Sequence, residues 1–283
     1  MPQAAIRSTR ACMEEAMIRD ITLGQYYPIE SPIHRLDPRT KLAGTLIFIV
    51  ALFVAQGLVA YLIATAFLAS VIRVSKVPLS YMVRGLKSIV ILLLFSVVFN
   101  IFFIQDGTML IHVGFITITT GGLIQAAFMA VRLVYLIIGS TLMTLTTTPN
   151  DLTDGLEKSL GFLKKIHVPV HEIAMIMSIA LRFIPILVEE TDKIMKAQMA
   201  RGADFESGNL IQRAKAMVPL LVPLFISAFR RASDLAMAME ARCYHGGEGR
   251  TKMKPLRYER ADKAAYGVLL AFLALMVVLR VLA

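Results

Sequence analysis

The fold is decided by the stretch LAGTLIFIVALFVAQGLVAYLIATAFLASVI, Leu42–Ile72, which contains no charged side chain. A helix needs roughly 20 mostly apolar residues to cross about 30 Å of membrane hydrocarbon. Gln56–Gly57 interrupts the stretch near its middle and therefore predicts two short or tilted spans. We expect the chain to cross a membrane twice within these residues, although the second segment, Leu58–Ile72, is short for a span.

Three further apolar segments follow, at Ser88–Ile104, Leu123–Leu145 and Ala264–Leu279. Hydrophobic residues make up 57% of the 283 positions and charged residues 18%, whereas soluble domains carry about 25% charged residues. Lipid offers no hydrogen-bond partner to an open backbone, so the spans should be helical. The sequence predicts an all-α polytopic membrane protein with about five transmembrane helices.

The placement of basic residues predicts the orientation. Lys and Arg occur before the first span, at Arg35, Arg39 and Lys41, and in the loop 73–87, but not in 105–122. Short loops rich in Lys and Arg stay in the cytoplasm. We expect a multi-pass protein of the bacterial cytoplasmic (inner) membrane with its N-terminus inside. The net charge of +10 follows largely from this topology. It does not indicate a nucleic-acid partner, because the basic residues are not gathered with stacking aromatics.

Four crossings return the chain to the cytoplasm near Thr148, so the segment that follows is expected to be cytoplasmic too. The predicted parts are a disordered N-terminal extension (1–20), in which Met13 or Met17 could also begin the chain, a four-helix transmembrane region (21–148), a cytoplasmic coupling domain (149–261) and a C-terminal transmembrane helix (262–283). Cys12 and Cys243 lie far apart and predict neither a disulfide nor a zinc site.

The cytoplasmic segment predicts a short helix and two long ones. Thr148 can cap a helix that has Pro149 in its first turn and runs to about residue 163. Apolar residues then recur at three- and four-residue spacing over Val170–Arg201, which predicts one long amphipathic helix ended by Gly202. A second runs from about residue 209 to 243, with bends expected at Pro219 and Pro223.

Three stretches resemble the T component of energy-coupling-factor transporters, the family that includes the membrane subunit of cobalt and nickel importers. They are SPIHRLDPRTKL at Ser31–Leu42, the run ALRFIPILVEE followed by AQMARG, and RRASDLAMAMEARCY. The resemblance covers Ile21 to the C-terminus. It implies that two triplets at the ends of the long helices contact two ABC ATPase subunits, each through its arginine. The triplets are Ala200-Arg201-Gly202 and Ala241-Arg242-Cys243, where Cys243 stands in place of the usual glycine.

The resemblance further implies a coupling subunit that transmits ATP-driven motion to a separate membrane-embedded substrate-binding S component for vitamin or transition-metal uptake. ATP and Mg would be held by the ATPases, and this chain would bind no cofactor or metal. An arginine suits such docking because its guanidinium binds carboxylates and carbonyls directionally, although a cation at a helix C-terminus is also favoured for local reasons. Residues expected to support the coupling helices are Arg182, Pro185, Glu189 and Glu240.

Two other charged or polar positions have structural interpretations. Arg132 lies inside the fourth apolar span, where we expect it to pair with helix-end carbonyls or with Asn100 rather than to line a transport path. His34 is expected to make local hydrogen bonds, and His167 and His171 lack a third metal ligand.

Two rival classes remain open from the residues alone. A conventional ABC permease domain would contact substrate itself, but it predicts more spans and a polar path. A membrane-embedded enzyme would need clustered acidic or histidine residues. The sequence has neither a phosphate-binding Gly-x-x-x-x-Gly-Lys-Ser/Thr loop nor a catalytic constellation, so it predicts a non-catalytic subunit.

Overall fold

The structure is a computed structural model that describes residues 26–87, 89–103, 108–113, 116–205, 209–246, 253 and 255–282. These residues form helices and one short β-hairpin, so the predicted helical membrane class is confirmed and the hairpin is an addition to it. The predicted extension at 1–20 lies outside the described residues. The described residues fall into two compact units, one within 1–155 and 256–283 and the other within 156–255.

The decisive apolar stretch forms two helices of the first unit, α2 (Pro38–Val54) and α3 (Gly57–Ser75). They are separated at Ala55–Gln56, one residue from the predicted break. Asp37, which directly precedes Pro38 and is therefore of a type and position that favour a helix start, caps α2: its carboxylate accepts a hydrogen bond from the backbone N–H of Arg39 at 2.9 Å. The stretch therefore forms two short or tilted helices instead of one long span, because the chain turns at Gln56 and Gly57.

The third predicted span is shorter than expected. Its residues form α5 (Val90–Phe103), which has 14 residues and a length of about 21 Å. This is less than the roughly 30 Å of a hydrocarbon core. The amphipathic helix α4 (Leu79–Lys87) precedes it.

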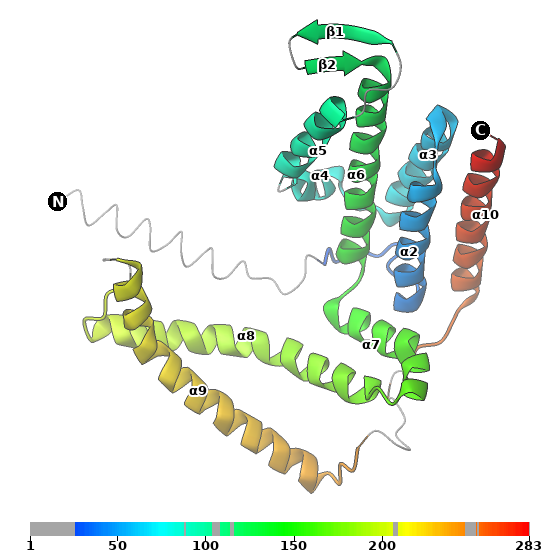
Figure 1. The fold of residues 1–283 in the computed structure, drawn as a ribbon. Helices are drawn as coiled ribbons and strands as arrows, with labels where there is room; N and C mark the ends of the chain where they lie inside the picture. Colours follow the sequence, from blue (N-terminus) through cyan, green and yellow to red (C-terminus); the bar gives the residue numbers. More distant parts are fainter. Residues whose placement is uncertain are drawn as a thin grey trace. The chain divides into compact units, whose positions relative to one another are not determined.

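The loop expected outside the membrane contains an antiparallel hairpin. Strand β1 (Met109–Val113) pairs with β2 (Ile116–Thr119), and the hairpin leads directly into α6 (Thr120–Thr146) (Figure 1). Thr119 caps α6 by accepting a hydrogen bond from the N–H of Gly122 at 3.2 Å. At 27 residues, α6 contains the whole of the predicted fourth span.

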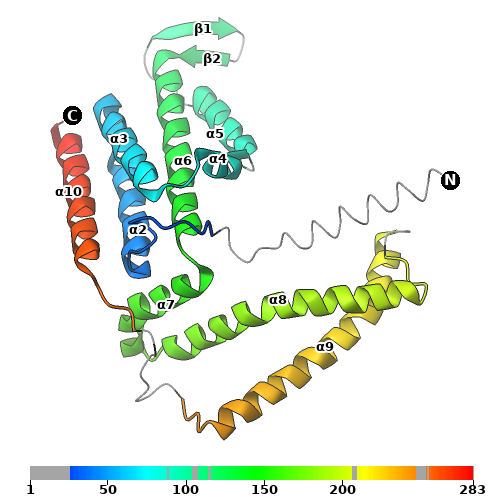
Figure 2. The ribbon, with the colours of Figure 1, turned by 180° about the vertical axis from the view of Figure 1, so that it is seen from behind.

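The core of this unit lies where α2, α3, α6 and α10 (Arg260–Leu282) meet, and Figures 1 and 2 show these helices side by side. Phe48, Phe67 and Phe272 stack on one another, the last two at 4.2 Å between ring centroids. Four alanines between them are fully or almost fully buried: Ala51, Ala55, Ala60 and Ala64. Small side chains let membrane helices approach closely, and α2 packs closely against α10 and α6.

The second unit contains the two long helices that the sequence predicted, α8 (Val170–Ala200) and α9 (Leu210–Ala241). Before them, α7 (Pro149–Ser159) begins in the first unit and ends in the second, where a 3-10 helix (Leu160–Ile166) follows it. Thr148 caps α7 as predicted, accepting from the N–H of Asp151 at 3.1 Å. α9 changes direction in its first half, the part that contains Pro219 and Pro223 (Figure 1).

Among the described helices, four are long and apolar enough to cross a membrane: α3, α6, α8 and α10. α2 has 17 residues and α5 has 14, so both are marginal by length alone. α8 meets the criterion although the sequence predicts a cytoplasmic helix there. It does so because its charged residues are concentrated at its two ends, with Arg182 the exception in the middle.

Candidate functional site

The two long helices form an antiparallel pair. The Glu190 carboxylate of α8 binds the Arg231 guanidinium of α9 at 2.8 Å. Further along α8, the Gln198 side-chain amide donates to the Pro219 carbonyl of α9 at 3.5 Å. Contacts made later in α8 thus involve residues earlier in α9, which defines the antiparallel arrangement seen in Figure 2. The C-terminal ends of the two helices therefore lie at opposite ends of the pair.

Both predicted arginine triplets end their helices with the same backbone motif. After α8, the N–H of Ala203 donates to the Gln198 carbonyl and the N–H of Gly202 to that of Met199, both at 3.0 Å. The residues at the end of α9 repeat this pattern: the N–H of Tyr244 donates to Met239 at 3.1 Å and that of Cys243 to Glu240 at 2.9 Å. This is the Schellman arrangement, which satisfies the last carbonyls of a helix.

The motif explains which residue type stands at the last position of each triplet. Arg201 and Arg242 are the last residues before the chain turns, and the residue after each has a positive φ, 90° at Gly202 and 55° at Cys243. Glycine adopts such angles without a steric cost, whereas a residue with a Cβ is disfavoured there. Cys243 is thus the structural equivalent of Gly202 held in a less favourable conformation, and the arginine before it keeps the same position.

The two guanidiniums are available to a partner. Arg201 and Arg242 are exposed, and within the described part of the chain neither side chain makes a hydrogen bond or an ion pair. Arg231, on the same pair of helices, is by contrast held by Glu190. Ala200 and Ala241, which precede the arginines, are exposed as well. Each helix therefore ends in a small exposed residue, a free cation and a sharp turn.

A hollow of about 860 Å³ lies between the first half of α8 and the end of α9. Arg182 of α8 and Arg242 of α9 both line it, together with apolar side chains such as Phe183 and Leu235. No acidic residue lines it among the described residues. The predicted supporting residue Arg182 and the predicted docking residue Arg242 are thus brought together, although 60 positions separate their numbers.

The other predicted supporting residues are less closely tied to the triplets. Pro185 lies inside α8, next to the segment that lines the hollow. Glu189 and Glu240 are exposed, and in the described part of the chain Glu240 makes no ion pair with Arg242. The interhelical ion pair uses Glu190 instead. Sequence reasoning missed it, although Glu190 falls four positions after Ile186 on the face that packs against α9.

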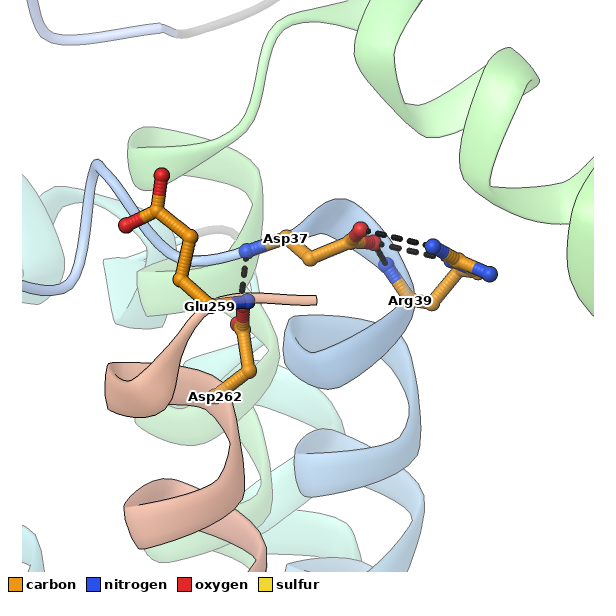
Figure 3. Close-up of polar contacts among 4 residues, drawn as sticks. All are labelled: Asp37, Arg39, Glu259 and Asp262. Carbon is orange, nitrogen blue, oxygen red and sulfur yellow. Dashed lines mark hydrogen bonds and ion pairs between the residues drawn. The ribbon is translucent and has the colours of Figure 1, made fainter. Parts of the chain in front are cut away.

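The stretch Ser31–Leu42, the first to carry the family resemblance, holds the ends of three helices together. Asp37 donates its backbone N–H to the buried carboxylate of Asp262 at the start of α10, and its own carboxylate binds Arg39 at 2.9 Å (Figure 3). The Lys41 ammonium donates to the Thr146 carbonyl, the last of α6, at 2.8 Å. The motif therefore has a structural role at one end of the helix bundle.

Two single residues behave as the sequence predicted. Arg132 of α6 donates to the Ala55 carbonyl at the end of α2 at 3.3 Å and to the Tyr61 hydroxyl at 3.0 Å, which is the expected helix-end pairing. His34 makes local hydrogen bonds, with Ser31 at 2.7 Å and with the Tyr27 carbonyl at 3.1 Å. Among the described residues, no group of three or more His, Cys, Asp or Glu side chains is placed to hold a metal ion.

The fold and the paired helix ends define a class: a multi-pass helical membrane protein with a separate two-helix unit. Comparison with known proteins identifies one family. The family model described as cobalt transport protein, CbiQ, matches residues 30–253. Proteins called energy-coupling factor transporter transmembrane protein EcfT are similar over most of their length. The protein from Thermosediminibacter oceani is 56% identical over 88% of this chain and 94% of its own length. The one from Clostridium kluyveri is 58% identical (87% and 92%), and the one from Bacillus subtilis is 49% identical (93% and 100%).

The chain therefore belongs to the CbiQ family of energy-coupling-factor transmembrane components. It is a transporter subunit and not an enzyme. This assignment removes the conventional permease and the membrane-embedded enzyme as readings of the sequence.

Proposed function

We propose that the second unit of this chain, residues 156–255, is a pair of rigid levers that couple two ABC ATPase subunits to the membrane part of the importer. Each lever is a long helix, α8 or α9, and each ends in an arginine that binds one ATPase. The observation that carries the proposal is the shared helix-end geometry: Arg201 and Arg242 occupy equivalent positions in two backbone turns of the same kind, and neither guanidinium has a partner among the described residues.

A helix end suits this task for a physical reason. The hydrogen-bonded turn fixes the direction in which the arginine leaves the helix, so displacement of the bound ATPase is passed to the helix rather than absorbed by a loop. A guanidinium adds two parallel hydrogen bonds to a carboxylate or to carbonyls, which gives the contact a defined geometry. Arg182, which shares the hollow with Arg242, would contact the same ATPase subunit.

The apolar faces of the levers supply a second contact surface. Many large apolar side chains on these helices are exposed within the described chain, including Ile173, Ile176 and Met177 on α8 and Phe225, Ile226 and Phe229 on α9. Exposed apolar area of this extent indicates a binding surface. The proposed occupant is the membrane-embedded S component, and methionines on these helices would let the surface adapt as that subunit moves.

Substrate recognition is assigned to the S component in this proposal. The imported solute would be a vitamin or a transition-metal ion such as cobalt or nickel, and this chain would bind neither the solute nor a cofactor. ATP and Mg would be bound by the ATPase subunits. The chain would act only through the position of its helices.

The test is assembly of the full complex with arginine variants. Arg201→Ala and Arg242→Ala should each weaken ATPase co-purification, and the double variant should abolish it while membrane insertion is retained. Loss of a buried, hydrogen-bonded charge contact costs about 2–5 kcal/mol. Arg230→Ala is the matched control, because Arg230 is an exposed arginine of α9 without an ion pair in the described chain. A double variant that still holds both ATPases and supports uptake would refute the lever proposal.

The proposed topology places the N-terminus and the levers in the bacterial cytoplasm. Cys243 is an exposed free cysteine that can report on this. In a Cys12→Ser background, a membrane-impermeant thiol reagent should label Cys243 only after cells are opened. Thr108→Cys, introduced beside the hairpin in a Cys12→Ser, Cys243→Ser background, should be labelled in intact cells. Labelling of Cys243 in intact cells would place α8 across the membrane instead.

A further inference from the structure

The helix bundle of the first unit contains an apolar cavity of about 380 Å³. Its walls come from one end of the bundle, where α2 and α10 begin and where α3 and α6 end. Representative lining residues are Phe48 of α2, Val71 of α3, Leu142 of α6 and Ala265 of α10. Polar residues line the cavity too, at Thr40, Lys41, Thr45, Ser70 and Thr146, but most of its wall is apolar, and apolar cavities take up apolar ligands. This cavity is therefore suited to a hydrocarbon chain rather than to water.

The cavity opens at the surface of the bundle between α3 and α10. Val268 of α10 lines it and is 58% exposed, and Val74 of α3 lines it and is exposed as well. Both helices are long and apolar enough to cross a membrane. The medium next to such an opening in a membrane-embedded bundle is lipid, so the nearest source of an apolar occupant is the acyl chain of a phospholipid.

One buried polar atom points to an occupant that carries a hydrogen-bond acceptor. Thr40 lines the cavity and is 2% exposed, and its hydroxyl oxygen has no hydrogen-bond partner among the residues that the structure describes. The other two threonines that line the cavity donate to the carbonyl four residues earlier, Thr45 to Lys41 and Thr146 to Leu142, both at 2.9 Å. The buried Thr147 hydroxyl of the same unit has no such partner in the described chain, but Thr147 does not line the cavity. An acyl ester has a carbonyl oxygen that could accept a hydrogen bond from Thr40.

The ends of the helices that flank the opening are cationic. Arg73 and Lys76 lie at the end of α3 and Lys263 lies in the first turn of α10. All three are exposed, and within the described residues none has an ion-pair partner. Basic groups beside a gap between membrane helices bind anionic lipid headgroups. The charge thus favours a phosphate that is not balanced by a cation of its own headgroup.

We propose that the cavity holds one acyl chain of an anionic phospholipid such as phosphatidylglycerol. The chain enters between α3 and α10, its ester carbonyl accepts the Thr40 hydroxyl, and its phosphate is bound by the basic side chains at the ends of these two helices. The lipid then completes the core on the side where α2, α3 and α10 leave a gap.

The experiment is native mass spectrometry of the full chain, purified in mild detergent and incubated with equal amounts of phosphatidylglycerol and phosphatidylcholine with the same acyl chains. The wild type should retain one phosphatidylglycerol. Thr40→Val keeps the shape and removes the hydroxyl, so it should lower retention about fivefold, the loss expected for one neutral hydrogen bond, without lowering the melting temperature of the lipid-free chain.

Two variants of α10 form the control pair. Val268→Phe should block the opening and abolish retention, whereas Val278→Phe, at a valine that is 52% exposed and does not line the cavity, should not. Ala265→Leu, which fills the cavity from inside, should also abolish retention. Equal retention of the two lipids, or undiminished retention by Val268→Phe and Ala265→Leu, would overturn the proposal. The proposal would also be overturned if the wild type carried no lipid and Val268→Phe abolished the binding of another membrane subunit. The cavity would then accept a protein helix.

Discussion

The carboxylate of Asp262 accepts a hydrogen bond from the backbone N–H of Asp37 at 2.9 Å, across 225 positions of sequence. Its second oxygen accepts the N–H of Glu259 at 2.8 Å (Figure 3). Asp262 is 1% exposed, and its carboxylate therefore accepts hydrogen bonds from the backbone N–H groups of the residues that precede α2 and α10. Arg39, bound to Asp37, also lies over the Tyr258 ring at 4.0 Å from its centroid, so the segment that leads into α10 is held from two sides.

Asp262→Ala should destabilise the protein by about 2–4 kcal/mol, because it removes two hydrogen bonds to a charged acceptor and leaves the N–H of Asp37 buried without a partner. Asp262→Asn keeps one acceptor oxygen and should cost less. The measurement is thermal unfolding of the full chain in detergent. Glu259→Ala is the control, since only the backbone N–H of Glu259 takes part. Equal losses for the Asp262 and Glu259 variants would show that the carboxylate does not join the helices.

The sequence predicted one half of this junction and not the other. Asp37 before Pro38 indicates a helix start by itself, because capping depends only on neighbouring residues. Asp262 is merely an acidic residue in the first turn of α10, which is favourable in any helix. That it also serves α2 depends on how the two helices pack, and nothing within a few residues of Asp262 encodes that.

The two equivalent helix ends should respond differently to the same substitution. Gly202→Ala places a Cβ at φ 90°, which should cost about 1 kcal/mol, whereas Cys243→Ala exchanges one side chain for another at φ 55° and should be nearly neutral. Hydrogen exchange of the amides of Ala203 and Tyr244 in the full chain measures each turn directly. If both variants fray their helix ends equally, the left-handed angle is not the reason for glycine in the triplet.

The candidate site was predictable where it depends on local sequence. Gly202 indicates the end of α8 through its conformational freedom, whereas the two arginines were expected from the resemblance of their triplets to the family. The interhelical contacts were harder to predict, because apolar residues lie on more than one side of α8. The apolar pattern over Val170–Arg201 includes Ile173, Ile176 and Met177, which are exposed. The side that faces α9 contains Ile179, Phe183, Ile186 and Glu190. Only the packed structure distinguishes these two faces.

Acidification should weaken the junction at the start of α2 through His34. Burial, and then the positive charge of Lys41, lower the pKa of His34 from its ordinary value of 6.5. The unfolded chain therefore takes up a proton below pH 6.5 that the folded chain resists. The free energy of unfolding should fall as the pH drops from 6.5 towards the folded-state pKa, and the contribution is fully present above 6.5.

The melting temperature of the full chain at pH 8 and pH 5 measures this effect. Both values lie above the window in which Asp37 titrates, because hydrogen bonds from Arg39 outweigh the opposing effect of burial and hold the pKa of Asp37 below 3.8. His34→Gln should reduce the loss of stability between the two pH values. A variant that loses as much as the wild type would assign the pH dependence to other groups.

The ion pair between Glu190 and Arg231 should fix how α8 and α9 lie against each other without contributing to ATPase binding. The pair is only partly buried, so a double-mutant cycle with Glu190→Gln and Arg231→Ala should give a coupling energy of about 0.5–1 kcal/mol in the unfolding of the full chain. Arg230→Ala, at the neighbouring exposed arginine, should show no coupling to Glu190→Gln. The Arg231→Ala variant should still co-purify with ATPases, because Arg201 and Arg242 are intact. If it loses them as completely as the double variant of the helix-end arginines does, the alignment of the helices matters as much as the guanidiniums, and docking cannot be assigned to the two helix ends alone.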